Sequence, residues 1–337
     1  MTVTPLSPAH TSASPAIIEE VLFEVKRLIV GQDHLLERLL VALLSRGHIL
    51  LEGVPGLAKT ATVKALAQVV GGSFGRIQFT PDLVPADLVG TRVYNGRTGE
   101  FTVELGPVFA NLLLADEINR APAKVQSALL EVMQERQVTI GKQTYRVPDP
   151  FLVLATQNPI ESDGTYPLPE AQLDRFMFKV LVDYPDYPDE FVVIERITGA
   201  PIILKTLLSP DQLRAIQATV EQVYVDPAVI GYAASLVTAT RKPAERGLAE
   251  YDGAVLFGAS PRASINLVLG ARALAFIRGR NHALPQDVAD LAPDVLRHRL
   301  VLSYDGIAAG VTPDQIVATL LQRFPPPRID LGDRHAA

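Results

Sequence analysis

The sequence predicts an α/β fold: a parallel sheet with helices on both faces, followed by a smaller all-α domain. Short apolar runs that suit buried strands alternate with stretches of helical period in the first part of the chain. A glycine-rich loop follows the first of these runs and leads into a helix. We therefore expect a sheet-containing core at residues 17–205, a helical domain at 206–325, a disordered N-terminal tail at 1–16 and a flexible C-terminal tail at 326–337.

The composition favours a globular protein and argues against nucleic-acid binding, thiolate metal sites and membrane insertion. Of the 337 residues, 48% are hydrophobic and 20% are charged. The net charge of −6 opposes a protein that mainly grips phosphate backbones, so we do not expect a nucleic-acid partner. Without cysteine, disulfides and thiolate metal sites are excluded, and the six histidines show no metal-ligand spacing. We see neither a signal peptide nor an apolar run of membrane length, which predicts a cytoplasmic protein without membrane insertion.

The elements of the core follow from apolar periodicity. The expected helices are residues 17–29, 33–47, 61–72 and 119–136. The expected buried strands are residues 48–53, 110–117, 151–159 and 176–185. Asp33 is placed as a cap or first-turn acid of its helix. Alternating residues on either side of a Gly-Lys turn predict a hairpin over residues 136–147.

The C-terminal part contains stretches of helical period and no convincing strand. These stretches are residues 209–224, 226–241, 260–279 and 284–302. Three of them open with Ser209, Asp226 or Ser260 followed by proline, a cap residue with proline at the first helical position. We expect a hinge between the two domains at residues 201–206.

The stretch GVPGLAKT at residues 53–60 nearly matches the phosphate-loop pattern G-x-x-x-x-G-K-[ST], with Ala58 in place of glycine. In such a loop, backbone N–H groups point at phosphate oxygens, Lys59 reaches the β- and γ-phosphates, and the Thr60 hydroxyl binds Mg²⁺. The extra methyl of Ala58 is tolerable if that residue keeps helix-like dihedrals. The alternative is a glycine-rich turn with a surface lysine. The predicted phosphate-binding residues are Gly53, Val54, Pro55, Gly56, Leu57, Ala58, Lys59, Thr60 and Ala61.

Polar residues at the ends of two later strands add to this prediction. Asp116 ends an apolar strand, where it would hold Mg²⁺ directly or through water, and Glu117 would act as general base toward the attacking water. Asn158 ends the next strand and would lie between that water and the γ-phosphate. The alternatives are two solvated acids and a turn-forming asparagine. Because the three motifs occur in this order, nucleotide hydrolysis is favoured.

Five stretches resemble the MoxR family of AAA+ ATPases in their order and separations. They are GVPGLAKT, LLLADEINRAPAKVQSALLEVMQER, ATQNP, LPEAQLDRF and GASPRAS. The resemblance extends from about residue 17 to about residue 323, and in that family alanine before the lysine is usual. Val30, Gly31 and Gln32 match the segment that lines the adenine pocket. The resemblance implies an AAA+ P-loop core with a helical lid, and ATP and Mg²⁺ as cofactors.

The resemblance also implies a homo-oligomeric ring, usually a hexamer, with ATP bound between neighbouring subunits. Arg175 then matches the arginine finger, although a local salt bridge to Asp174 or Glu170 is the alternative. Arg262 matches the sensor-2 arginine of the lid, and whether it acts in its own subunit or in a neighbour stays open. As a cation in a first helical turn, Arg262 opposes the helix dipole at a cost of about 0.3–1 kcal/mol. It has no obvious partner in the sequence, which favours anion binding.

Two further stretches, residues 82–107 and 137–147, resemble inserts that point toward the central pore of related rings. Their aromatic side chains would touch a partner there or simply pack within hairpins. These aromatic residues are Tyr94, Phe101 and Tyr145. Arg120 is expected near the subunit interface, with its role undecided.

The expected function is ATP hydrolysis by a chaperone that assists assembly, maturation or metal insertion of client proteins. The resemblance further implies a partner with a von Willebrand factor A domain. One alternative is a DNA motor whose hairpin residues Lys142 and Arg146 contact DNA. Another is a magnesium-chelatase-type subunit that drives metal insertion into a tetrapyrrole.

Overall fold

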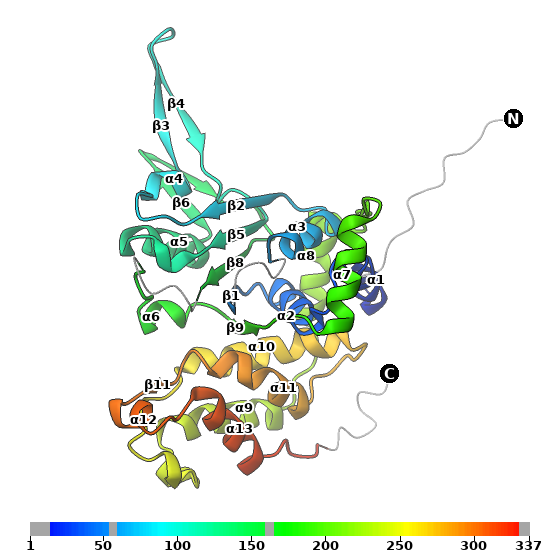
Figure 1. Cartoon of the computed structure of the whole chain (residues 1–337), viewed down its shortest axis with the longest axis vertical. Helices are drawn as coiled ribbons and strands as arrows, with labels where there is room; N and C mark the ends of the chain where they lie inside the picture. Colours follow the sequence, from blue (N-terminus) through cyan, green and yellow to red (C-terminus); the bar gives the residue numbers. More distant parts are fainter. Residues whose placement is uncertain (1–13, 54–58, 159–164, 330–337) are drawn as a thin grey trace, which may run out of the picture.

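A five-stranded parallel sheet forms the centre of the core (Figure 1). The computed structural model describes residues 14–53, 59–158 and 165–329. The strands are β1 (Ile49–Gly53), β2 (Phe74–Gln78), β5 (Leu112–Asp116), β8 (Leu152–Gln157) and β9 (Phe178–Val182). Their order across the sheet is β2-β5-β8-β1-β9, and every neighbouring pair is parallel. The predicted parallel sheet is thus confirmed.

The extent of burial explains which of the five strands the sequence revealed. Strands β1, β5 and β8 lie inside the sheet, and their residues are almost all buried and apolar. Strand β2 lies at the edge and buries only Ile77, with Gly75, Arg76 and Gln78 around it. It therefore has no apolar run, and the sequence analysis did not place it.

Alternate residues of β1, β5 and β8 face two separate hydrophobic clusters, as the pleat of a strand requires. On one face, Ile49 and Leu51 pack with α1 (Pro15–Lys26), α2 (Asp33–Leu44) and α3 (Lys59–Val69). On the other, Leu50 packs with α4 (Pro85–Val89) and α5 (Ala123–Glu135). The sheet is therefore covered on both faces. Helix α1 begins at Pro15, inside the expected tail 1–16, and the remainder of that tail up to residue 13 lies outside the described residues.

Two antiparallel hairpins leave the core on the side of α4 and α5. The first joins β3 (Gly90–Asn95) and β4 (Glu100–Leu105) and projects well beyond the sheet (Figure 1). The second joins β6 (Gln137–Ile140) and β7 (Gln143–Arg146), which confirms the predicted hairpin. Gly141 in its turn has a φ of 66°, the left-handed conformation that glycine adopts without a Cβ penalty.

The C-terminal part is helical, with one exception. Its helices are α8 (Pro210–Glu221), α9 (Pro227–Arg241), α10 (Pro261–Ile277), α11 (Pro285–Leu296), α12 (Tyr304–Ala308) and α13 (Pro313–Arg323). The side chains of Ser209, Asp226 and Ser260 each accept a backbone N–H at the start of a helix, as predicted. The expectation that no strand lies here is wrong at one place, because β10 (Val255–Phe257) pairs with β11 (Val301–Leu302). Leu302 lies in a segment that had been assigned to a helix.

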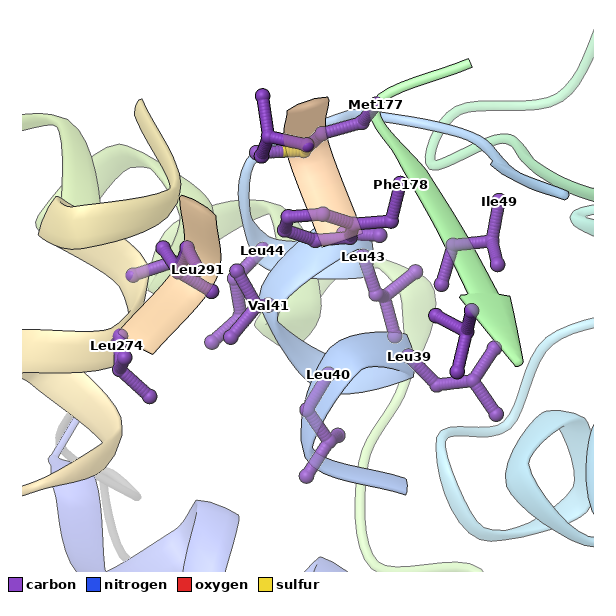
Figure 2. Close-up of a cluster of buried hydrophobic side chains, with 14 of the residues drawn as sticks. Leu39, Leu40, Val41, Leu43, Leu44, Ile49, Met177, Phe178, Leu274 and Leu291 are labelled. Carbon is purple, nitrogen blue, oxygen red and sulfur yellow. The ribbon is translucent and has the colours of Figure 1, made fainter. Parts of the chain in front are cut away.

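The helical lid packs directly on the core. Apolar residues of α2 lie between Phe178 of β9 and the lid residues Leu274 and Leu291 (Figure 2). Next to this contact, buried Arg38 on α2 donates from Nε to Asp294 Oδ2 on α11 at 2.6 Å. This buried ion pair joins α2 of the core to α11 of the lid.

The connection between core and lid is itself hydrogen-bonded to the core. Leu204 and Leu208 are buried, and the Leu207 N–H donates to the Val69 carbonyl at 2.8 Å. The Lys205 N–H donates to Glu24 Oε1 at 2.8 Å. Residues 201–206, the expected hinge, are therefore held against α1 and α3, and the boundary at residue 205 stays a prediction. The described part of the expected C-terminal tail includes Ile329, which packs against the hydrophobic cluster shared by core and lid, and residues from 330 onward lie outside the described ranges.

Candidate functional site

Most of the predicted site residues meet at the carboxyl edge of the sheet. Gly53 ends β1, Asp116 ends β5, and Asn158 directly follows β8. The pairing registers place Glu52 opposite Gln157 and Gln78 opposite Asp116, so these ends are level with one another. Ligands of open α/β sheets bind at this edge. Residues 54–58, which include Val54, Pro55, Gly56, Leu57 and Ala58, lie outside the described residues, and the prediction for their loop stays a prediction.

Lys59 begins α3 and turns back toward the strand that precedes it. Its Nζ donates to the Gly53 carbonyl at 2.7 Å. Burial lowers the pKa of Lys59, while the negative charges of Asp116, Glu117 and Glu52 oppose that shift. The ammonium group therefore shares its electrostatic environment with the acids that end β5. Thr60 and Ala61 follow in the first turn of α3 and are partly exposed.

The two predicted acids are held from the neighbouring strand β8. The Thr156 hydroxyl donates to Asp116 Oδ1 at 2.7 Å, and the Glu117 N–H donates to the same hydroxyl oxygen at 2.8 Å. Glu117 has a φ of 57° and a ψ of 51°, which is left-handed and unfavourable for a residue with a Cβ. The backbone thus turns sharply at Glu117, directly after Asp116.

Side chains of β2 contact the same two acids from the other side. Arg76 Nη2 lies 2.8 Å from Asp116 Oδ2, and Gln78 Nε2 donates to Glu117 Oε2 at 2.9 Å. Arg120 Nη1 also approaches Glu117 Oε2, at 3.3 Å. Arg76, Gln78 and Thr156 were not predicted, since they meet the two acids across neighbouring strands that lie far away in the chain. The position of Arg120 beside Glu117 gives that undecided residue a local partner.

The oxygens at this edge suit a hard cation such as Mg²⁺. Carboxylate, hydroxyl and water oxygens are its preferred ligands, and Asp116 and Thr60 are the residues that would hold it. One carboxylate oxygen of Asp116 accepts the Thr156 hydroxyl. The other already accepts a hydrogen bond from a positively charged group, the Arg76 guanidinium. The donor set therefore fits the ion. Within the described ranges, no group of three or more His, Asp or Glu side chains forms a protein-only metal site.

A largely apolar cavity of about 260 Å³ lies beside α3. It is lined by Leu28, Ile29, Val30, Gln32, Ala61, Pro185, Val193, Arg196, Ile197, Pro201 and Ile202. Its volume is near the lower limit of about 300 Å³ for small-molecule sites, and such a cavity suits a planar heterocycle. Val30 and Gln32 were expected here. Gly31, also expected here, lies between them in the chain but is not among the lining residues; its φ of 67° and the 2.3 Å that would separate a Cβ on it from Asp189 Oδ2 explain the glycine.

Helix α7 (Tyr187–Thr198) supplies three lining residues of this cavity that no sequence pattern revealed. Val193, Arg196 and Ile197 come from it, and Arg196 is anchored by donating from Nη1 to the Lys26 carbonyl at 2.6 Å. A signal for α7 was present, because Asp186 is followed by Tyr-Pro and caps the helix by accepting the Asp189 N–H.

Asp174 joins three residues of the lid. It accepts from Ser260 Oγ at 2.9 Å, from Arg262 Nη1 at 3.2 Å and from Arg299 Nε at 2.7 Å. Arg299 is buried, and burial lowers its pKa to about 10 in spite of Asp174. The expectation that Arg262 has no partner is therefore wrong. Since no sequence signal singles out Arg299, it was missed as well.

Arg175 follows Asp174 but does not share its contacts. Neither Asp174 nor Glu170 pairs with it, and throughout residues 14–53, 59–158 and 165–329 no ion pair of Arg175 occurs. The local salt bridge that was the alternative for this residue is thus absent from the described ranges. Its side chain is partly exposed and available to a group outside this chain.

Arg175 and Arg262 lie at the opposite edge of the sheet from the other site residues. In the β1–β9 register, Ile49 faces Phe178 and Gly53 faces Val182. The segment before Phe178 lies beside the residue before β1, since the Met177 N–H donates to the His48 carbonyl at 2.8 Å. Five residue steps of strand, from His48 to Gly53, or about 16 Å, therefore separate this segment from Gly53. Arg262 lies at the same edge, because its guanidinium is paired with Asp174.

The hairpin aromatics differ in exposure. Tyr94 and Phe101 are each 57% exposed, and their rings pair at 5.2 Å on the projecting hairpin. Arg92 lies over the Phe101 ring at 4.6 Å from its centre. Tyr145 instead packs edge-on against Phe109 at 6.4 Å and is partly buried. The first hairpin therefore presents an aromatic surface, and the second does so less.

The buried histidines are neutral structural residues. Burial lowers the pKa of His48 to about 3 and that of His298 well below its usual range. His48 accepts the Val153 N–H at Nδ1 and bonds the Met133 carbonyl through Nε2.

Among the described residues, no helix combines the length and apolarity needed to cross a membrane.

Two family models match the chain. The model described as the ATPase family associated with various cellular activities (AAA) matches residues 48–178, which contain β1, β5, β8 and the predicted motifs between them. The model described as the AAA lid domain matches residues 251–320 in the helical part.

Known proteins similar to this chain agree with those models. "Chaperone MoxR1" of Mycobacterium tuberculosis is 54% identical over 333 residues, which cover 96% of this chain and 88% of that protein. "Uncharacterized protein YeaC" of Bacillus subtilis is 42% identical, over 88% of this chain and 91% of its own. A crystal structure of a protein assigned as an ATPase from Cytophaga hutchinsonii has a TM-score of 0.89 at 48% identity, covering 93% and 96% of the two chains.

Proposed function

Because this chain belongs to the MoxR family of AAA+ ATPases, we propose that it hydrolyses ATP with Mg²⁺ at the interfaces of a homo-oligomeric ring. Hydrolysis would drive its action as a chaperone on client proteins. The observation that carries the proposal is the separation of the site into two halves. Lys59, Asp116 and Glu117 lie at the carboxyl edge of the sheet, and Arg175 and Arg262 lie at the amino edge.

The carboxyl edge supplies the groups that bind ATP and activate water. Lys59 would exchange its bond to the Gly53 carbonyl for the phosphates, and the cavity beside α3 would take the adenine ring. Glu117 would accept the proton of the attacking water, while Asn158 would orient that water toward the γ-phosphate. Mg²⁺, held by Asp116 and Thr60, would neutralise charge on the β- and γ-phosphate oxygens.

The amino edge would complete the site of a neighbouring subunit. Arg262 is held at Asp174 and is separated from its own Gly53 by the length of the sheet, which favours action in a neighbour over action in its own subunit. The same argument applies to Arg175, which follows Asp174. Heterologous contacts of this kind generate closed rings when the rotation closes, and a hexamer is the size that we propose.

The client surface proposed here is the projecting β3–β4 hairpin. Tyr94 and Phe101 are exposed there, and aromatic side chains supply much of the contact energy at protein interfaces. A partner with a von Willebrand factor A domain, a role in metal insertion and a cytoplasmic location are parts of the same proposal and rest on the family alone.

A DNA motor is the second candidate, supported by the exposed Lys142 and Arg146 on the second hairpin. It predicts hydrolysis that rises when DNA is added and binding that weakens steeply with salt. The proposed chaperone role predicts neither effect.

The experiment that tests the proposed function measures ATP binding and phosphate release by the wild type, Lys59→Ala and Glu117→Gln. Lys59→Ala should lose ATP affinity, because a methyl group cannot offset phosphate charge. Glu117→Gln should bind ATP normally and release almost no phosphate, since an amide cannot accept the proton. Wild-type protein that releases no phosphate at any concentration would contradict the proposal.

A further inference from the structure

The Thr156 side chain is the buried contact shared by both acids of the site. It lies on β8, is 2% exposed, and sits between β5 and β1 in the sheet. Carboxylate oxygens accept only, and a backbone N–H donates only. The proton of the hydroxyl must therefore point to Asp116 Oδ1, while its oxygen accepts the Glu117 N–H. Both bonds are satisfied with one fixed orientation of the hydroxyl.

This contact acts on backbone direction as well as on a side chain. Glu117 is left-handed, and such residues persist only where the surroundings hold them. The bond from the Glu117 N–H to Thr156 holds the amino side of this residue, and its carbonyl accepts the Arg120 N–H at 2.9 Å on the other side. The direction in which the Glu117 side chain leaves the backbone therefore depends on the Thr156 hydroxyl.

The other contacts of the acids are of a different kind. Arg76 and Gln78 come from the edge strand β2, and their hydrogen bonds to the two carboxylates are exposed to solvent. Both hold carboxylate oxygens that must become free when ATP, water and Mg²⁺ arrive. Thr156 instead occupies Asp116 Oδ1 from inside the sheet and leaves Oδ2 and the whole Glu117 carboxylate to the reaction.

We propose that Thr156 is a positioning residue for ATP hydrolysis, which fixes the Mg²⁺-holding Asp116 and the general base Glu117 relative to each other. The inference rests on the proposed function of these two acids. Because Thr156 is buried, it would act on the reaction only through the two acids. Its hydroxyl fixes the distance and angle between the two acids, and a misplacement of about 1 Å in such a constellation costs roughly 10²-fold in rate.

The test compares Thr156→Val, which keeps the shape and loses the hydroxyl, with Thr156→Ser, which keeps the hydroxyl. For Val we expect kcat to fall roughly 10²-fold, with little change in ATP affinity measured in EDTA. The gain in ATP affinity on adding Mg²⁺ should shrink several-fold. Exchange of the Glu117 amide with deuterium should accelerate up to about 10-fold, the effect of losing one hydrogen bond. Ser should restore all three readouts most of the way.

Thr240→Val is the matched control for loss of a buried hydroxyl. Thr240 is fully buried in the lid, donates to the Val237 carbonyl at 2.7 Å and accepts the Ala259 N–H at 3.0 Å. Thr240→Val should lower the melting temperature by about as much as Thr156→Val does. It should leave the exchange of the Glu117 amide and the gain in ATP affinity on adding Mg²⁺ unchanged.

The outcomes separate this inference from the function on which it rests. A Val variant with wild-type kcat, Mg²⁺ gain and Glu117 exchange overturns the positioning role. A Ser variant as defective as Val also overturns it, because the methyl packing and not the hydroxyl would then matter. If the wild type itself hydrolyses no ATP, the proposed function fails, and the positioning role fails with it.

Discussion

Arg262 and Asp174 form an ion pair, 3.2 Å from Nη1 to Oδ2, that joins the first turn of a lid helix to the core. Asp174 stands directly before Arg175, so the pair also holds Arg262 close to Arg175 at the amino edge of the sheet. The same carboxylate binds the buried Arg299. Replacing either acid or base at this point therefore has separable consequences for stability and for hydrolysis.

Asp174→Asn should destabilise the fold strongly, and Arg262→Ala should not. Loss of the carboxylate leaves the buried Arg299 uncompensated, which costs about 3–5 kcal/mol. Arg262 is 44% exposed, and an exposed pair contributes at most about 1 kcal/mol. Urea unfolding of the two variants measures the difference. Equal destabilisation by both would mean that Arg262 has a packing role that its exposure hides.

Arg175→Ala should bind ATP normally yet hydrolyse it poorly, and a neighbour should repair the loss. An arginine acting on transition-state charge contributes on the order of 10³-fold in rate, which is about 4 kcal/mol. Mixing Arg175→Ala with Lys59→Ala creates some interfaces with Lys59 on one side and Arg175 on the other. Phosphate release should pass through a maximum as the mixing ratio varies. With subunit exchange verified by fluorescence, no recovery at any ratio would place Arg175 in its own subunit or in a structural role.

Arg76→Ala should lower the Mg²⁺ concentration needed for half-maximal hydrolysis, by several-fold. The Arg76 guanidinium occupies Asp116 Oδ2 at 2.8 Å, and Mg²⁺ must displace it to use that oxygen. Arg97→Ala, on the exposed tip of the first hairpin, is the control for loss of one positive charge. A higher Mg²⁺ requirement in Arg76→Ala would show instead that Arg76 orients Asp116.

Asp294→Asn should destabilise the protein at neutral pH by up to about 3–5 kcal/mol, because the buried Arg38 would lose one of its two acidic partners and keep only Glu37. Burial raises the pKa of Asp294, but His34, Arg38 and Arg297 outweigh burial and hold that pKa below the usual range of an aspartate. A carboxyl with a lowered folded-state pKa contributes stability above its unfolded pKa and loses it as the pH falls through the folded value. The difference between wild type and Asn should therefore shrink below about pH 4. Thermal melts from pH 3 to 7 measure it, and a difference independent of pH would contradict the assignment.

The parts of the fold that sequence patterns predicted are those decided by local residues. Strands β1, β5 and β8 are apolar runs because they are buried on both faces, and the helix caps at Ser209, Asp226 and Ser260 are short-range hydrogen bonds. Asp116 and Glu117 could be predicted because they follow such a run.

The parts that sequence patterns missed depend on contacts between distant segments. Edge strand β2 buries one residue and has no period, so Arg76 and Gln78 could not be assigned. Thr156 looks like any strand residue until β8 lies beside β5. The partner of Arg262 is 88 positions away along the chain, and only the packing of the lid on the core brings Asp174 to it.

The placement of the two half-sites at opposite edges of one sheet has a thermodynamic consequence. If one ATP molecule contacts Lys59 of one subunit and Arg262 of the next, nucleotide binding and association are linked equilibria. By reciprocity, ATP must strengthen association by the same factor by which association strengthens ATP binding. Dilution would then lower the apparent affinity for ATP, and release of nucleotide after hydrolysis would loosen the contact between neighbours. The nucleotide would hold neighbouring subunits together reversibly, and the fraction of associated subunits would depend on the concentrations of ATP and of the protein itself.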